Sequence, residues 1–233
     1  MTGIRSRTAA GSSDPAAGPR LGAAFFARPT QRVARGLLGA RLQVTDGLRT
    51  REVRLVETEA YVRNDAASHA FRGPTRRNRS MFNGPGTLYV FRIHQVVCAN
   101  LVTRPGEAVL LRAGAPSEGT VGTATGPGRL CRTLGITIAD DGQDAVTGPR
   151  LRVLPRATRP RRIAVGPRVG IRRAAERPLR FWIEGDPAVS RARRPTASAS
   201  PSRSRVAGRY PQNRRRNRPA SGGGRSDGRT AGR

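Results

Sequence analysis

Two carboxylates lie in a stretch of the chain that alternates in the manner of a β-strand. Residues 53–62 read VRLVETEAYV, and in a regular strand every second side chain shares one face: Val53, Leu55, Glu57, Glu59 and Tyr61. A carboxylate on an otherwise apolar strand is costly unless it is paired or used, and such a group can act as a general base toward water. Tyr61 offers a flat ring on which a nucleobase could stack. The pattern leaves open whether Glu57 and Glu59 do chemistry or form ion pairs with arginines.

A second segment, residues 65–91, interleaves basic and aromatic side chains. The basic ones are Arg72, Arg76, Arg77 and Arg79, and the aromatic ones are Phe71, Phe82, Tyr89 and Phe91. Guanidinium groups contact phosphates and rings stack on bases, so this composition favours a nucleic-acid surface. The alternative is a surface loop whose aromatic residues only anchor it to the core.

The charge of the whole chain narrows the class of partner. Its 233 residues include 44 basic ones, all arginine, against 15 acidic ones, so the net charge is +29. Nucleic acid is the commonest partner for such a charge, and an acidic membrane surface is the runner-up. With no lysine, the chain lacks a side-chain amine for Schiff-base chemistry and the lysine of a phosphate-binding P-loop. Two cysteines and two histidines make a disulfide framework or a closed zinc site improbable.

The elements that must position these residues lie in the middle of the chain. We expect a disordered arm over residues 1–20, one domain over 21–190, and an arginine-rich disordered tail over 191–233, which has 13 arginines and one acidic residue. Within the domain, a helix is predicted after Pro29, with Thr30 as its cap. A second helix is predicted over residues 126–136, with a stop at Gly135. Further strands are predicted over residues 87–93, 108–113, 162–171 and 179–185.

A series of motifs covers about residues 25–190: FFARPTQRVARGLLGARL, LVETEAY, ASHAFRGPTRRNRSMF, GPGTLYVF, AVLLRA, GPGRLC, PRVGI, RPLRFWIEG and PAVS. In this order they resemble the 3-methyladenine DNA glycosylase family of the alkyladenine type. The resemblance implies a single α/β domain of the α+β kind around a curved antiparallel sheet. It also implies a monomer without cofactor, metal or membrane contact, whose partner is double-stranded DNA containing damaged purines.

The resemblance further implies a base-excision repair reaction. An alkylated or deaminated purine, such as 3-methyladenine, 7-methylguanine or hypoxanthine, is flipped out, and its N-glycosidic bond is hydrolysed to leave an abasic site. Glu59 is implied as the general base that activates water. Arg112 would orient the water and the sugar-phosphate, and the backbone carbonyl of Val169 would help to hold the water.

The resemblance assigns four residues to the base pocket. Tyr61 and His69 would stack against the flipped base, and His69 would also be placed to form a hydrogen bond with it. Phe91 takes the place of an aromatic residue, commonly Tyr, that closes the other face. Asn100 would lie at the floor and obstruct the 2-amino group of normal guanine.

The chain departs from the family pattern after Phe91. Residues 92–95 read RIHQ, so His94 occupies the position of the intercalating Tyr and Gln95 replaces the Gly beside it. A histidine ring has less stacking area than a tyrosine ring, and losing the Gly could forbid a positive-φ turn. We expect His94 to enter the DNA stack, and three arginines to contact the DNA: Arg76, Arg77 and Arg79.

The same departure keeps two other classes open. One is a catalytically weakened or inactive arginine-rich DNA-binding protein derived from this family, and the other is a structural protein of an RNA-rich assembly. The ETEAY motif and Asn100 argue against both. Because the chain has no lysine, we expect a monofunctional enzyme without lyase activity. No apolar stretch typical of a secretory signal opens the sequence, so we expect a cytoplasmic, nucleoid-associated protein.

Overall fold

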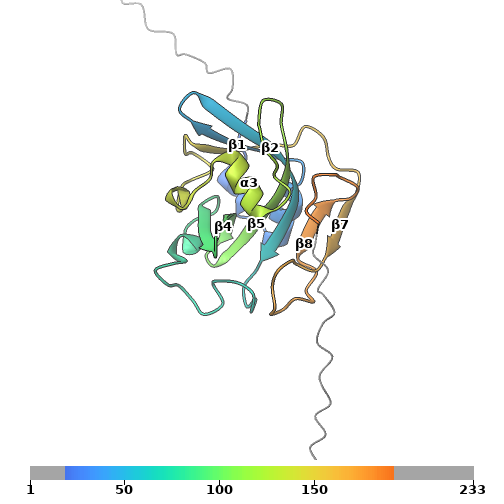
Figure 1. Ribbon diagram of the computed structural model, residues 1–233. Coiled ribbons are helices and arrows are strands. Elements are labelled where there is room, and N and C mark those ends of the chain that lie inside the picture. The colour runs from blue at the N-terminus through green and yellow to red at the C-terminus, as the bar shows by residue number, and fades with distance from the viewer. Residues whose placement is uncertain (1–18, 192–233) are drawn as a thin grey trace, which may run out of the picture. The chain divides into compact units, whose positions relative to one another are not determined.

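The computed structural model describes residues 19–191. Apart from residues 19, 20 and 191, the predicted arm and tail lie outside the described residues. Within them, eight strands form one antiparallel sheet that curls into a half-barrel (Figure 1). The strands are β1 (Arg41–Asp46), β2 (Arg49–Tyr61), β3 (Leu88–Ile93), β4 (Val96–Arg104), β5 (Glu107–Pro116), β6 (Leu151–Leu154), β7 (Ile163–Gly166) and β8 (Arg180–Ile183). The predicted α+β class with a curved antiparallel sheet is therefore confirmed.

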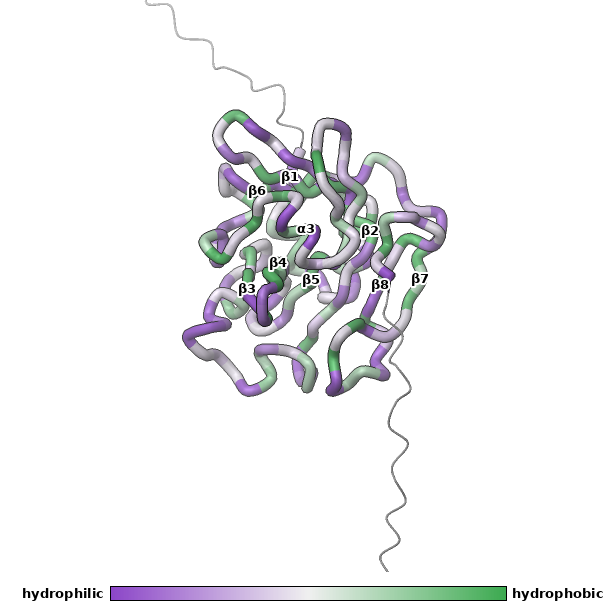
Figure 2. Tube along the Cα trace, in the orientation of Figure 1, coloured by the Kyte–Doolittle hydropathy of each residue, from purple (hydrophilic) through white to green (hydrophobic). Residues whose placement is uncertain are grey.

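The long strand β2 organises this sheet. The strand order is β3-β4-β5-β2-β1-β6, and β8 also pairs with β2 at Glu57–Glu59 and carries β7 on its other edge. The C-terminal half of β2 therefore lies between β5 and β8, and it is buried from Leu55 to Ala60. Figure 2 shows hydrophilic residues in the outer loops and also along parts of the strands, among them the start of β2. A central strand of this kind holds its side chains more rigidly than a loop can.

A β-bulge interrupts the alternation of β2. The register with β5 shifts on both sides of Glu57, so Val53 and Leu55 lie in the main hydrophobic core together with Ala60. Glu57 and Glu59 face the other side of the strand. The prediction that all five alternating side chains share one face is therefore wrong, because it assumed a regular strand. The bulge lets a half-strand that points Val53 and Leu55 into the core continue directly into one that presents carboxylates on the other side.

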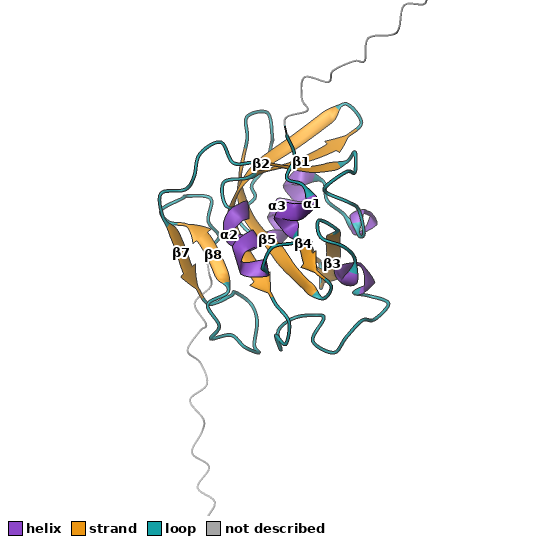
Figure 3. Ribbon diagram, turned by 180° about the vertical axis from the view of Figure 1, so that it is seen from behind, coloured by secondary structure: helices purple, strands orange, loops and turns teal. Residues whose placement is uncertain are grey.

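Three short helices pack against the strands: α1 (Ala23–Phe26), α2 (Thr30–Leu37) and α3 (Pro127–Leu134). Two 3-10 turns, η1 (Arg79–Phe82) and η2 (Ile138–Asp140), complete the helical elements of the described residues. Figure 3 shows α1 and α2 in front of the sheet when it is seen from behind. Apolar residues of all three helices join the main core. None of the helices in residues 19–191 has the length and apolar character that crossing a membrane requires.

The two predicted helix boundaries had different outcomes. α3 ends where Gly135 adopts the left-handed conformation, at φ 72°, so the predicted stop is confirmed. Thr30 is not the cap of α2, because Pro29 occupies the cap position and makes no side-chain bond. The Thr30 hydroxyl instead donates to the carboxylate of Glu107 and contacts the Thr103 hydroxyl at 2.8 Å. A tertiary partner therefore competes successfully with the local capping bond.

The strand predictions were also uneven. Residues 53–62, 87–93, 108–113 and 179–185 overlap β2, β3, β5 and β8. The strand predicted over 162–171 ends at Gly166, and residues 167–171 form a loop beside the sheet. That loop carries Val169 to the site.

Candidate active site

A cavity of about 370 Å³ opens beside the C-terminal half of β2. Six residues that the sequence analysis singled out line it together: Tyr61, His69, Phe91, Asn100, Arg112 and Val169. They come from β2, β3, β4, β5 and two loops, so the curl of the sheet is what brings them together. The volume is within the range of pockets that hold small organic molecules.

Glu59 lies behind the wall of this cavity. Its side chain is fully buried, and its carboxylate contacts three groups that line the cavity. The Tyr61 hydroxyl donates to Oε2 at 3.0 Å, and the Val169 backbone N–H donates to Oε1 at 2.9 Å. The Arg112 guanidinium lies 3.4 Å from Oε1. The donor from Val169 is its N–H, whereas the sequence analysis named its carbonyl, whose role stays a prediction.

The protonation of Glu59 reflects a balance between burial and these donors. Burial raises the pKa of the Glu59 carboxyl, while Arg112 and the Val169 N–H lower it; the net shift is upward. A carboxylate whose pKa is moved toward neutrality is better matched to accept a proton at physiological pH. The three donors hold its two oxygens in one orientation.

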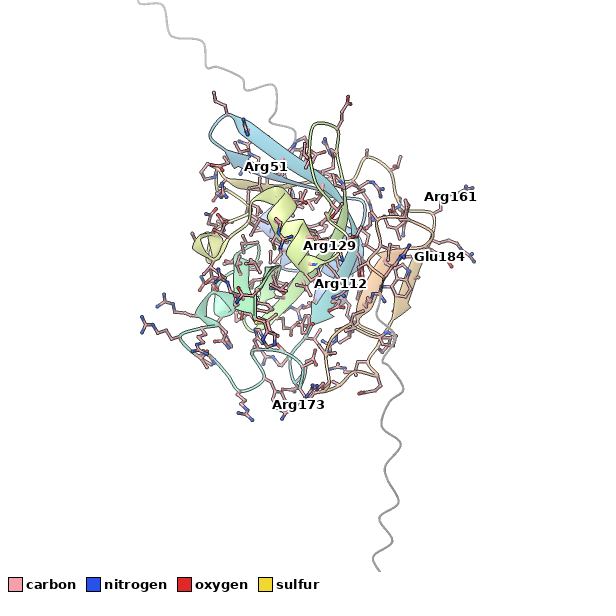
Figure 4. All side chains as sticks on the ribbon, viewed as in Figure 1. Arg51, Arg112, Arg129, Arg161, Arg173 and Glu184 are labelled. Atoms are coloured by element: carbon pink, nitrogen blue, oxygen red, sulfur yellow. The ribbon has the colours of Figure 1, made fainter. Side chains whose placement is uncertain are left out.

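The second carboxylate, Glu57, forms an ion-pair network. Its fully buried side chain lies 2.6 Å from Arg180 Nε and 2.9 Å from Arg112 Nε. The backbone N–H and the hydroxyl of Ser190 donate to it at 2.8 and 3.0 Å. The alternative that these glutamates pair with arginines is therefore confirmed for Glu57, while Glu59 shares Arg112 with it. Figure 4 shows Arg112 toward the middle of the domain, whereas Arg161 extends from its edge.

An aromatic cluster forms another wall of the cavity. The rings of His69 and Phe91 lie 4.3 Å apart, and those of Tyr89 and Phe91 lie 5.5 Å apart. His69 Nδ1 and the Tyr89 hydroxyl share a hydrogen bond of 2.7 Å. Burial lowers the pKa of His69, so its imidazole is neutral at physiological pH. A neutral ring can donate from one nitrogen and accept at the other.

Part of the cavity is lined by residues of the β3–β4 pair. Asn100 stands opposite Tyr89 across this pair, and its amide donates to the Tyr89 carbonyl at 3.1 Å. The sequence analysis assigned no pocket role to Tyr89, Met81 or Cys98, which also line the cavity. The spacing of Tyr89 and Phe91, two residues apart on one strand, was a signal that could have identified Tyr89.

The tip of the β3–β4 hairpin rises at the mouth of the cavity. Ile93 and Val96 line the mouth and are 52% and 41% exposed, and between them the exposed turn carries His94 and Gln95. The positive φ, 52°, falls on His94 and not on Gln95. The replaced glycine therefore does not prevent a tight turn, because the left-handed conformation has fallen on the preceding residue.

Helix α3 packs against this hairpin at Val96. A Cβ atom added at Gly128 would lie 2.8 Å from Val96 Cγ1, so only a glycine lets the helix approach so closely. In the sequence, three exposed arginines fall between the cavity residues His69 and Met81: Arg76, Arg77 and Arg79. Exposed basic side chains therefore occur in the chain segment that connects two residues of the cavity.

Metal ligands are not gathered at this site. Residues 19–191 contain no cluster of three or more His, Cys, Asp or Glu side chains suited to a metal ion. Cys98 and Cys131 are buried free thiols, and burial raises the pKa of Cys98 to about 11. A thiol of this kind is a poor nucleophile at neutral pH.

Comparison with known proteins agrees with the motif order. The profile of the Methylpurine-DNA glycosylase (MPG) family matches residues 24–187. A protein of Rhizobium etli is 43% identical over 181 residues, which are 72% of this chain and 87% of the relative. One of Methanoculleus marisnigri is 42% identical over 190 residues (73% and 98%), and one of Anaeromyxobacter sp. is 45% identical over 181 residues (74% and 93%). Each relative is provisionally named a 3-methyladenine DNA glycosylase.

Proposed function

The chain belongs to the methylpurine-DNA glycosylase family and is a 3-methyladenine DNA glycosylase, and we propose that it flips a damaged purine out of duplex DNA into the cavity. One observation carries this proposal: the cavity has an aromatic wall, and three groups that line the same cavity hold the fully buried Glu59 carboxylate behind its surface. The aromatic stacking surface and the carboxylate proposed as general base therefore lie at the same cavity, the carboxylate behind its wall. An enzyme that acts on a base must take it out of the stack to reach it.

The substrates that we propose are alkylated and deaminated purines of the 3-methyladenine, 7-methylguanine and hypoxanthine type. N-alkylation places positive charge on the purine, which aromatic faces attract and which makes the base a better leaving group. His69 and Phe91 supply such faces. Asn100 at the floor crowds a 2-amino group, so undamaged guanine is disfavoured.

In the chemical step, the bond between C1′ and the purine nitrogen breaks and its electron pair leaves with the base. A water oxygen forms the new bond to C1′, and Glu59 takes the proton of that water. The transition state resembles an oxocarbenium ion, so the negative charge of Glu59 also stabilises it. For a neutral base such as hypoxanthine, a donor must also supply a proton or hydrogen bond to the leaving purine. Since the chain has no lysine, the product is an intact abasic site.

The β3–β4 hairpin is the element that we propose to fill the gap in the DNA. Ile93 and Val96 form the apolar sides of the hairpin end, and His94 forms its tip. Exposed arginines of the segment after His69, among them Arg76 and Arg77, would neutralise phosphates. Side chains that insert between base steps are commonly apolar wedges, so a histidine at the tip is a weak one.

A direct assay tests the function. The full chain is incubated with duplex DNA holding one hypoxanthine or one 3-methyladenine, and alkali then cleaves any abasic site. We expect base release by the native protein, no strand cleavage before alkali, and loss of release in Glu59→Gln. The exposed His94 favours a second candidate, a DNA-binding protein with weakened or no catalysis. Lesion binding without release of either base would support that candidate and contradict the first.

A further inference from the structure

The structure contains a buried ion pair that the reaction scheme leaves unused. The side chains of Asp65 and Arg168 are fully buried, and Arg168 Nη1 and Nη2 donate to both carboxylate oxygens, the latter at 2.9 Å. The two residues are 103 positions apart in the sequence. A buried pair of this kind is often no more stable than well-packed apolar residues, so stability alone is a weak reason for it.

Arg168 contacts strand β2, which carries Glu59. Its Nη1 donates to the Ala60 carbonyl at 3.1 Å, and its guanidinium lies 4.6 Å from the centre of the Tyr61 ring. The next residue, Val169, donates its backbone N–H to Glu59. The arginine therefore holds the loop that carries one hydrogen-bond donor to the base, and it supports the ring that carries another.

Asp65 forms hydrogen bonds with the turn that precedes His69, which contributes another part of the cavity lining. Its Oδ1 accepts the Ala67 N–H at 3.1 Å, and its carbonyl accepts the Ser68 N–H at 2.8 Å. This turn leads directly to His69, and Ala67 itself lines the cavity. Burial opposes ionisation of Asp65, but the hydrogen bonds from Arg168 and Ala67 lower its pKa overall. The pair is therefore ionised at neutral pH.

We propose that Asp65 and Arg168 are positioning residues for base release. Their ion pair fixes the Val169 loop, the Tyr61 ring and the turn before His69 in position relative to one another. Neither side chain lines the cavity, so they act through those groups and not on the substrate. The inference rests on the proposed role of Glu59 as the base. Its measurable consequence is the ease with which Glu59 ionises.

Every element packed around Glu59 contributes a group to that ionisation. The neighbours are Glu57 and Tyr61 on β2, Cys98 on β4, Arg112 on β5, and Arg168 and Val169 on the loop. On β8, Arg180 stands opposite Glu59 in the strand register and pairs with Glu57. Hydrogen bonds to a carboxylate favour its charged form. If Val169 loses its place, Glu59 loses one donor and its pKa rises further.

The informative variant is Arg168→Lys, which keeps the charge but cannot bind both oxygens of Asp65 and support the ring at once. We expect single-turnover release of hypoxanthine at neutral pH to slow by about tenfold. We also expect the acid limb of the rate profile to move up by about one pH unit. The matched control is Arg150→Lys, because Arg150 pairs with Asp140 at 2.6 Å and with two backbone carbonyls away from the cavity. The control should keep the rate and the acid limb of the native chain.

A second variant guards against misfolding. Asp65→Asn combined with Arg168→Met removes both charges at once and leaves neither stranded. It should fold and should still show the shifted acid limb. A loss of thermal stability with an unchanged acid limb, in both this variant and Arg168→Lys, would overturn the proposal and leave the pair a structural one.

A titration separates this inference from the proposed function. The carboxyl of Glu59 is followed by ¹³C NMR in the native chain and in Arg168→Lys, with Glu59→Gln to assign the signal. If the native protein releases no base, the proposed function fails, but a higher pKa of Glu59 in Arg168→Lys still supports the positioning role. An unchanged pKa of Glu59 would overturn it whatever the activity.

Discussion

The buried end of the site and the hairpin at its mouth are built in opposite ways. At the buried end, Glu57 accepts hydrogen bonds from Arg180 on β8 and from the Ser190 N–H, and Glu59 accepts one from the Val169 N–H. Arg112 on β5 lies within ion-pair distance of both carboxylates. At the mouth, residues 93–96 are exposed or half-exposed, and His94 has a backbone conformation that favours glycine. Substitutions at the first end disturb many partners, whereas those at the second disturb few. The proposed chemistry therefore depends on long-range packing, whereas the proposed insertion of the hairpin tip into DNA depends on local residues.

The strongest test of the buried end is Glu59→Gln. The amide keeps the volume but cannot take a proton from water, so base release should fall by about 10³-fold. Single-turnover assays measure this, and binding to a duplex with an abasic-site analogue should stay close to the native value. Loss of release in Glu57→Gln but not in Glu59→Gln would assign the base to the other carboxylate.

The same variant has a pH-dependent effect on stability. The pKa of Glu59 is raised in the folded state, so the folded chain binds a proton more tightly than the unfolded chain. Stability then falls as pH rises from the unfolded value through the raised one. Glu59→Gln removes this loss, so in denaturant titrations its stability relative to the native chain should increase as the pH rises above the ordinary glutamate pKa of about 4.3. A difference independent of pH would contradict the upward shift.

Next in size is the effect of Glu57→Gln on stability. The change leaves Arg180 and Arg112 without their shared carboxylate in a buried place, which costs about 3 kcal/mol of unfolding free energy. Urea unfolding measures it. Glu184→Gln is the matched control, because the Arg162–Glu184 pair is exposed and should contribute little. Equal unfolding free energies of Glu57→Gln and Glu184→Gln would show that the buried ion-pair network does not stabilise the fold more than an exposed pair does.

Asn100 belongs to neither region: it is a buried residue that lines the cavity. Asn100→Ser should make room for a 2-amino group and raise the release of undamaged guanine about tenfold. Guanine released from undamaged duplex DNA is quantified, with hypoxanthine release as the reference. Unchanged guanine release would remove Asn100 from the account of specificity.

The smallest effect is expected at the hairpin tip. His94→Tyr combined with Gln95→Gly restores a larger ring and a flexible turn, so hypoxanthine release should rise about threefold, with little change in stability. His94→Tyr alone separates the ring from the backbone. If neither variant changes release, His94 is a surface residue and not the wedge. A large change in the unfolding free energy of either variant would instead show that the hairpin tip depends on packing, as the buried end does.

Much of the site was predictable because its residues carry local signals. The alternation and the ETEAY motif located Glu59 and Tyr61, and the motif order assigned His69, Asn100 and Arg112. The structure places all of them at one cavity or directly behind its wall. The catalytic, stacking and DNA-binding roles stay predictions until they are tested.

The rest depended on contacts between distant parts of the chain. Alternation could not distinguish Glu57 from Glu59, since the difference lies in Ser190 and Arg180, more than 120 positions away. It also could not reveal the bulge that turns Leu55 and Glu57 to opposite sides, because a bulge is a property of the pairing between β2 and β5. The sequence by itself determined which side chains could react, stack and bind phosphate. Only the tertiary structure decided which carboxylate is saturated by ion pairs and which lies beside the cavity, because burial and partner geometry exist only in the folded chain.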